Sequence, residues 1–283
     1  MTMGKSRPRR PVGALLAILI YSLCATACGA DDGKRIVVFV QATKDQSINR
    51  MIMDKYVWYV YQAVARPGEF FQLEMYPINA NTAASTAFFS AAVRNGEFQS
   101  RERSAARQKF LTLHDILNKT YGSRESELVD VVGSLGIIDE TLGTVKDPKP
   151  VYVIYVSDMV QNNGPDGYDF TGYHGGKSLD DCRRHLEQET ATILPHRDAF
   201  RRVGILVLKL DLRALFRAKG TESEPPPKNI AEIDKFWDST VFQNLLHAGS
   251  YEVSRSQDVQ GVVEHFLSYK HGNWWNILGL SAR

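Results

Sequence analysis

Val151-Tyr152-Val153-Ile154-Tyr155-Val156 is an unbroken apolar run rich in β-branched and aromatic residues, and Pro148 and Pro150 precede it. A continuous run of this kind is typical of a strand that is covered on both faces in a parallel sheet. Two further runs of the same type, Ile36–Val40 and Val203–Leu210, lie before and after it in the sequence. The chain therefore contains several buried strands, which favours a sheet covered by helices.

Segments with helical spacing of apolar residues separate these strands. A further strand fits Phe70–Ile78. Helices are expected after Ser47, at Ser126–Ile138, Ser178–Phe200 and Ile230–His247, and over most of residues 82–118. This alternation predicts an α/β fold with a Rossmann-like, mostly parallel central sheet flanked by helices. In such sheets ligands bind beyond the carboxyl ends of the strands, so functional residues are expected there.

The first 27 residues have the features of a cleavable signal peptide. Four basic and no acidic residues fall within the first ten positions, and Val12–Leu23 is almost entirely apolar. About a dozen apolar residues are too few to cross a membrane, which takes roughly 20. Ala25-Thr26-Ala27-Cys28-Gly29 resembles the bacterial lipobox, so we expect Sec export, cleavage after Ala27 and lipidation of Cys28. Ordinary signal peptidase cleavage at the same bond would instead release a secreted protein.

The rest of the chain is expected to form one domain with short extensions. We assign residues 28–33 to a lipidated tether, 34–249 to the α/β domain and 250–283 to a C-terminal extension. Removing the leader removes four basic residues, which leaves 30 basic and 32 acidic residues and a formal charge of −2. A nucleic-acid-binding surface is therefore not expected. Cys182 would be left without an internal partner, so we expect no structural disulfide.

Four short motifs resemble a von Willebrand factor A-type (vWA) domain in the divergent form found in bacterial envelope lipoproteins. They are Ile36–Val40 running into Gln41-Ala42-Thr43-Lys44-Asp45, the helix that opens at Ser126, Tyr155-Val156-Ser157-Asp158-Met159, and the aromatic helix around Phe236-Trp237. The resemblance covers Lys34–Gly249. It implies the same Rossmann-like sheet and a binding surface at its strand ends.

The resemblance also implies a site for a divalent cation. Family members often hold the ion through an Asp-x-Ser-x-Ser loop after the first strand, a Thr or Ser from a later loop, and an Asp after the fourth strand. The matching residues here are Thr43, Asp45, Ser126 and Asp158, which implies Mg²⁺ as the cofactor. The chain departs from the pattern at Gln41, where the leading Asp is usual. The same residues also fit caps of helices and strand ends, so both interpretations stay open.

We expect a non-catalytic, membrane-anchored adhesion or scaffolding protein of the bacterial cell envelope. Its binding face would comprise Gln41, Asn162 and Asn163 with the glycine-rich stretch Gln161–Lys177, because such loops can vary without disturbing the sheet. The partner would be an envelope or extracellular protein, and Cys28 would hold the chain to the membrane. The alternative is a metal-assisted periplasmic phosphohydrolase that uses Asp45 and Asp158. That alternative needs an acidic residue directly after the first strand, and the four residues that follow Val40 include none.

Overall fold

The computed structural model describes residues 34–64, 71–93, 112, 128–145, 149–220 and 226–268. Within these ranges six strands form one sheet in the order β3-β2-β1-β4-β5-β6, and every neighbouring pair is parallel except β2 and β3. The strands are β1 (Lys34–Gln41), β2 (Phe71–Ile78), β3 (Phe89–Val93), β4 (Val151–Ser157), β5 (Val203–Lys209) and β6 (Ser250–Ser254). The predicted α/β fold with a mostly parallel, Rossmann-like sheet is confirmed.

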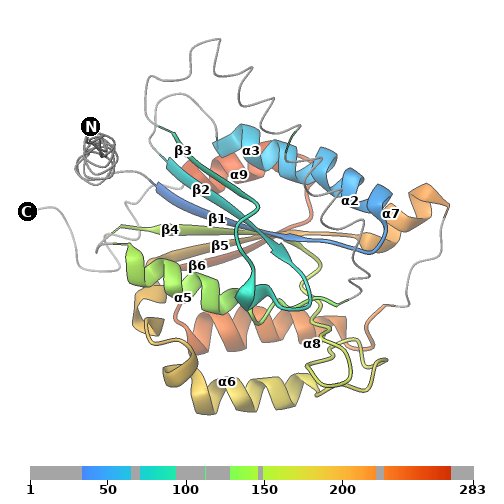
Figure 1. The fold of residues 1–283 in the computed structure, drawn as a ribbon, viewed down its shortest axis with the longest axis vertical. Helices are drawn as coiled ribbons and strands as arrows, with labels where there is room; N and C mark the ends of the chain where they lie inside the picture. The colour runs from blue at the N-terminus through green and yellow to red at the C-terminus, as the bar shows by residue number, and fades with distance from the viewer. Residues whose placement is uncertain are drawn as a thin grey trace, which may run out of the picture. The chain divides into compact units, whose positions relative to one another are not determined.

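Helices cover both faces of the sheet (Figure 1). One layer contains α2 (Gln46–Ile52), α3 (Trp58–Val64), α7 (Leu212–Lys219) and α9 (Val259–Ser268), and the other contains α5 (Ser134–Thr144), α6 (Leu179–Ile193) and α8 (Ile230–Lys235). Alternate residues of β1 pack into the two layers, Val38 into the first and Phe39 into the second. Because helices cover both faces of β1, the side chains on both of its faces must be apolar. This explains the continuous apolar run from which the strand was predicted.

Several elements differ from the expected ones. Residues 82–93 are not a helix: a short 3₁₀ turn, Thr82–Ala84, is followed by β3, whose pairing with β2 overrides the helical preference of its alanines. The helix expected from Ser126 begins at Ser134 in the described residues. The expected helix Ile230–His247 consists of α8 and a π-helix, Phe236–Leu245. The expected helix Ser178–Phe200 ends at Ile193, before Pro195, and a 3₁₀ helix follows at Arg197–Arg202.

The carboxyl-terminal elements correct the expected domain boundary at residue 249. β6 pairs with β5 as the last strand of the sheet, and α9 lies against α3 with Val263 and Phe266 buried. The domain therefore continues to Ser268, because its sheet and one helical layer are incomplete without these residues. The leader, Cys28 and the tether lie outside the described residues. No helix of the described part is long and apolar enough to cross a membrane.

Candidate functional site

Gln41 joins the carboxyl ends of the two central strands. Its side chain is buried, and its Oε1 accepts hydrogen bonds from Ser157 Oγ at 2.7 Å and from Asp158 N at 2.9 Å. Ser157 Oγ in turn accepts a hydrogen bond from Met159 N at 2.8 Å. An amide carbonyl oxygen has two lone pairs, and both are used here. The side chain of Gln41 is therefore committed to holding β1 and β4 together.

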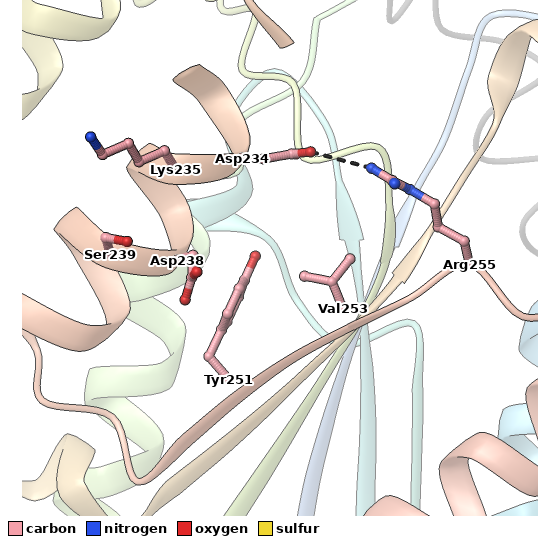
Figure 2. A pocket seen from close by; sticks show the side chains of 7 residues that line it. All are labelled: Asp234, Lys235, Asp238, Ser239, Tyr251, Val253 and Arg255. Atoms are coloured by element: carbon pink, nitrogen blue, oxygen red, sulfur yellow. Dashed lines mark hydrogen bonds and ion pairs between the residues drawn. The ribbon is translucent and has the colours of Figure 1, made fainter. Parts of the chain in front are cut away.

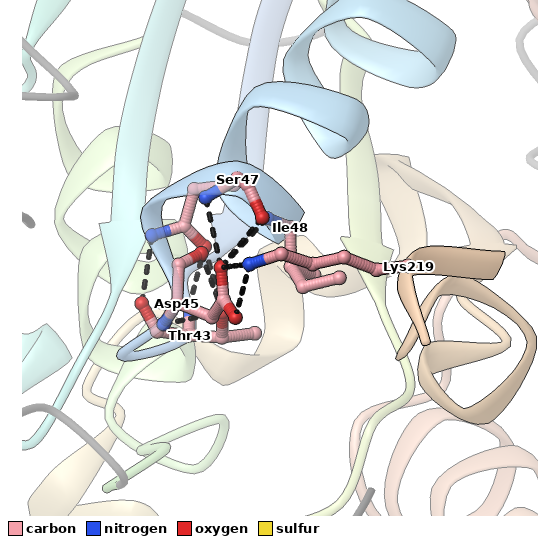
Figure 3. Close-up of polar contacts among 6 residues, drawn as sticks. Thr43, Asp45, Ser47, Ile48 and Lys219 are labelled. Atoms are coloured by element: carbon pink, nitrogen blue, oxygen red, sulfur yellow. Dashed lines mark hydrogen bonds and ion pairs between the residues drawn. The ribbon is translucent and has the colours of Figure 1, made fainter. Parts of the chain in front are cut away.

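The loop after β1 is stabilised by its own polar side chains (Figure 3). Asp45 is the N-cap of α2, and its Oδ1 accepts from Ser47 N at 2.9 Å, Ser47 Oγ at 2.8 Å and Ile48 N at 3.3 Å. Asn49 Oδ1 accepts from Thr43 N, and Asn49 Nδ2 donates to Thr43 O, each at 2.7 Å. These bonds satisfy backbone groups that a helix start leaves without partners. The sequence left open whether Asp45 is a metal ligand or a helix cap, and the structure shows it as the cap of α2.

Lys219 brings a positive charge to the same loop. Its Nζ lies 2.8 Å from Oδ1 and 2.7 Å from Oδ2 of Asp45 (Figure 3). Lys219 ends α7, and Gly220 follows it in the left-handed conformation with φ 75°. The hydrogen bond from Lys219 is the main reason that the pKa of Asp45 is lowered to about 2; partial burial opposes this shift, and the bonds from Ser47 and Ile48 add to it. A cation bound by both oxygens of Asp45 would have to displace this ammonium group.

The turn after β4 is held in a single backbone conformation. Asp158 Oδ1 accepts from Val160 N at 2.9 Å. Met159 has a φ of 61°, which is uncommon for a residue with a side chain, and its carbonyl oxygen accepts from Trp237 Nε1 at 2.8 Å. The tryptophan of the π-helix therefore fixes the turn in which Asp158 lies.

Two of the three residues expected on the binding face are buried. Gln41 is 4% exposed and Asn162 is 5% exposed, and Asn162 Oδ1 accepts from Gly164 N at 3.1 Å. Their burial corrects the expectation that these side chains contact a partner, because both are used inside the protein. Asn163 is half-buried. Ser126, the fourth predicted metal ligand, lies outside the described residues.

The contacts described above do not fit a Mg²⁺ site built from the predicted residues. Mg²⁺ requires near-octahedral oxygen ligands and usually one or two carboxylates. Gln41 Oε1 has both lone pairs engaged, and Asp45 is paired with Lys219. Across the described ranges, no three His, Cys, Asp or Glu side chains gather in a way that could hold a metal. The same ion pair occupies Asp45, one of the two carboxylates that the phosphohydrolase alternative would use.

A second cluster of hydrogen bonds organises the glycine-rich stretch after β4. The buried carboxylate of Asp169 accepts from Thr171 N at 2.9 Å, Gly172 N at 3.2 Å and His174 N at 2.7 Å, and also from Thr171 Oγ1. Burial raises the pKa of Asp169, but these hydrogen bonds together outweigh it and lower the pKa overall. The stretch is thereby fixed, and it holds Tyr173 at the surface with 46% of the residue exposed.

Tyr173 is also attached to the segment before α8. Its hydroxyl donates to Pro226 O at 3.0 Å, and Lys228 Nζ lies 4.9 Å from the centre of its ring and donates to Gly172 O at 2.9 Å. Ile230, the first residue of α8, is 47% exposed. We call Tyr173, Lys228 and Ile230 the loop surface. The sequence analysis placed the stretch Gln161–Lys177, which includes Tyr173, on the binding face, but it did not single out Tyr173, Lys228 or Ile230 individually.

The sequence matches no protein-family model and no curated protein. Similar solved structures include a von Willebrand factor type A protein from Catenulispora acidiphila, with 12% identity over 83% of this chain and 43% of that chain, at a TM-score of 0.39. The manganese-loaded TRAP protein of Plasmodium vivax is 12% identical over 84% of this chain and 75% of that chain (TM-score 0.37). The human COPII-coat protein Sec24c is 10% identical over 87% of this chain and 32% of that chain (TM-score 0.40). These values do not assign the chain to a family, and the chain spans less than half of the first of these proteins.

Proposed function

We propose that this chain is a non-catalytic protein-binding domain that engages its partner through the loop surface. The observation that carries the proposal is the fixed, exposed position of Tyr173, which Asp169 organises from within and Lys228 covers on one side. A rigid aromatic side chain loses little conformational freedom on binding, and Tyr is enriched among the residues that dominate interface energies. The ammonium group of Lys228 adds a cationic contact beside the Tyr173 ring, and Ile230, two residues further along the chain, adds an exposed apolar side chain.

We infer further that binding requires no divalent cation. Lys219 already supplies the positive charge that Asp45 needs, and Gln41 joins the strand ends without an ion. Calorimetric titration of Mg²⁺, Mn²⁺ and Ca²⁺ into the chain from Gly29 on is therefore expected to give no binding heat. Binding heat that disappears in Asp158→Ala would contradict this inference.

The anchoring part of the proposal rests on Cys28 and on the small residues before it. We propose that the mature protein is lipid-anchored in the cell envelope through Cys28. Growth with a clickable palmitate analogue is expected to label the wild-type chain and leave Cys28→Ala unlabelled. A wild-type chain that is unlabelled and found free in the medium would support the secreted alternative.

The binding proposal is tested by exchanging one exposed tyrosine at a time. Tyr173→Ala is expected to weaken capture of partners from an envelope extract by about thirtyfold, since truncating an interface hot spot costs about 2 kcal/mol or more. Tyr59→Ala is the matched control, because Tyr59 is 40% exposed on α3, in the other helical layer. The proposal fails if both variants capture the same partners equally well, or if a chelator abolishes capture.

A further inference from the structure

The outer edge of β6 is open within the described residues. β6 is the last strand in the sheet order and pairs there with β5 alone. Val253, the last residue but one of β6, is 47% exposed. An edge strand presents unpaired backbone N–H and C=O groups, which makes it a template for pairing with a further strand.

Backbone hydrogen bonds around β5 show which of its residues bond toward β6. Leu210 N, directly after β5, donates to Ser157 O of β4, whereas Val203 O of β5 accepts from Gly249 N beside β6. Successive residues of a strand direct their backbone groups to opposite sides. Even-numbered residues of β5 therefore bond toward β4 and odd-numbered residues bond toward β6.

The register then identifies the free groups of β6. Ile205 lies opposite Tyr251, and Val207 lies opposite Val253. In a parallel ladder, a residue bonds to the two residues that flank its register partner and not to the partner itself. The N–H and C=O groups of Tyr251 and Val253 consequently point away from β5, toward the open edge.

A cavity of about 490 Å³ lies beside this edge, between β6 and the helical segment that begins with α8. Figure 2 shows Tyr251 and Val253 directed into this space, with Asp238 next to the Tyr251 ring and Lys235 pointing away. At its rim, Arg255 Nη2 lies 3.3 Å from Asp234 Oδ2, and the Arg255 side chain is 71% exposed. An exposed ion pair of this kind contributes little to the stability of the fold, so Arg255 can leave Asp234 and contact another group at little cost in free energy.

We propose that two copies of this chain pair through their β6 strands, antiparallel and with the two-fold axis at Val253. In this register Val253 faces Val253 of the second copy, Tyr251 faces Arg255, and Glu252 faces Ser254. Each pair on the cavity side joins compatible chemistry: two apolar side chains at the axis, and a guanidinium over an aromatic ring on either side of it.

Charge selects this register over its neighbour. The guanidinium of Arg255 from the second copy would enter the cavity beside Tyr251 and the carboxylate of Asp238, both of which line it. Moving the axis by one residue to Glu252 would place two glutamates directly opposite each other, which destabilises a strand pair. Pairing at Val253 also removes the exposed apolar side chain of β6 from water. The edge is therefore complementary to itself in one register.

The first experiment is sedimentation equilibrium of the chain from Gly29 on, which keeps the whole compact unit that begins at Gly33. We expect a concentration-dependent monomer–dimer equilibrium that Val253→Lys abolishes. Ile230→Lys is the matched control, because Ile230 is equally exposed and lies on the loop surface. It should lose partner binding and keep the dimer, so the two proposals can fail separately. A monomer at all concentrations, or a dimer unaffected by Val253→Lys, overturns the pairing.

Cysteine cross-linking tests the register without a destabilising change. Facing residues in an antiparallel pair have Cα atoms about 5.5 Å apart at hydrogen-bonded positions and about 4.5 Å apart at the others, both within the range that a disulfide spans. Under mild oxidation Val253→Cys should form a covalent dimer, whereas Glu252→Cys and Ser254→Cys should do so only when mixed with each other. Self-cross-linking at residue 252, or protection of the Val253 amide from hydrogen exchange in the monomer, would overturn the proposal, the latter because another segment of the chain would then cover the edge.

Discussion

Lys219 and Asp45 form an ion pair at a position where the sequence resemblance had implied a bound cation. The two residues are separated by 174 positions in the chain, and α7 brings the ammonium group onto the loop after β1. The sequence identified Asp45 as a candidate ligand or a helix cap, because both roles need an oxygen at the start of α2. It gave no sign of Lys219, since the pairing depends on how α7 packs beside α2. Of the predicted metal residues, Thr43 and Asp45 are therefore hydrogen-bonded to each other, and the carboxylate of Asp45 is paired with the ammonium group of Lys219.

Lys219→Met tests this ion pair through its dependence on pH. Asp45 has a folded-state pKa of about 2 against an ordinary value of 3.8, so the pair stabilises the fold above about pH 4 and its contribution is lost as the pH falls toward 2. Both side chains are partly exposed, so we expect the variant to lose only roughly 0.2–1 kcal/mol in urea unfolding at neutral pH. At low pH the variant and the wild type should have the same free energy of unfolding. Lys55→Met, on an exposed position, is the control and should show no such pH-dependent difference.

Among the secondary-structure elements, the strands that are buried on both faces were predicted best from the sequence. β1, β4 and β5 carry continuous apolar runs, because both layers of helices cover them. The edge strands β3 and β6 were missed, since a half-covered strand such as Ser250–Ser254 needs no apolar run. The π-helix that continues α8 was also not foreseen, because its apolar spacing resembles that of an α-helix.

Two glycines in different elements should respond oppositely to alanine. An added Cβ at Gly176 would lie 2.6 Å from Gly164 O and 2.8 Å from Gly167 O, so the glycine-rich stretch would have to shift; we expect a loss of about 1–3 kcal/mol. Gly136 lies in α5 with no atom within 4 Å of the added Cβ, and Gly136→Ala should gain roughly 0.4–1 kcal/mol. Urea unfolding measures both. A stabilised Gly176→Ala would show that the stretch is looser than its hydrogen bonds indicate.

At the scale of the whole domain, the described residues form a sheet between two layers of helices, and Cys182 lies in the apolar core beneath one of these layers. The thiol is buried on α6, and burial, with a smaller effect of the Asp130 charge, raises its pKa to about 12. Because the thiolate is the reactive form, a buried thiol of this kind is inert while the fold is closed.

Alkylation of Cys182 should therefore follow unfolding of the whole domain. The chain from Gly29 on contains no other cysteine. Near pH 8 we expect the thiol of the native protein to be alkylated at least about a thousandfold more slowly than the thiol in denaturant. The reagent can reach a buried thiol only when the whole domain unfolds. Rapid alkylation of the native chain would mean that α6 opens locally.

The central position of β1 has a consequence for how the chain folds. β1 lies between β2 and β4, but β4 begins at Val151, 110 positions after β1 ends at Gln41. As the polypeptide emerges from its amino terminus, β1 can pair with β2 early, whereas its other edge has no neighbour until about half of the domain has been made. Closing so long a loop into a parallel pair is slow. During that interval the apolar strand Ile36–Val40 is the segment that a chaperone would recognise first, and the one from which aggregation during refolding is expected to start.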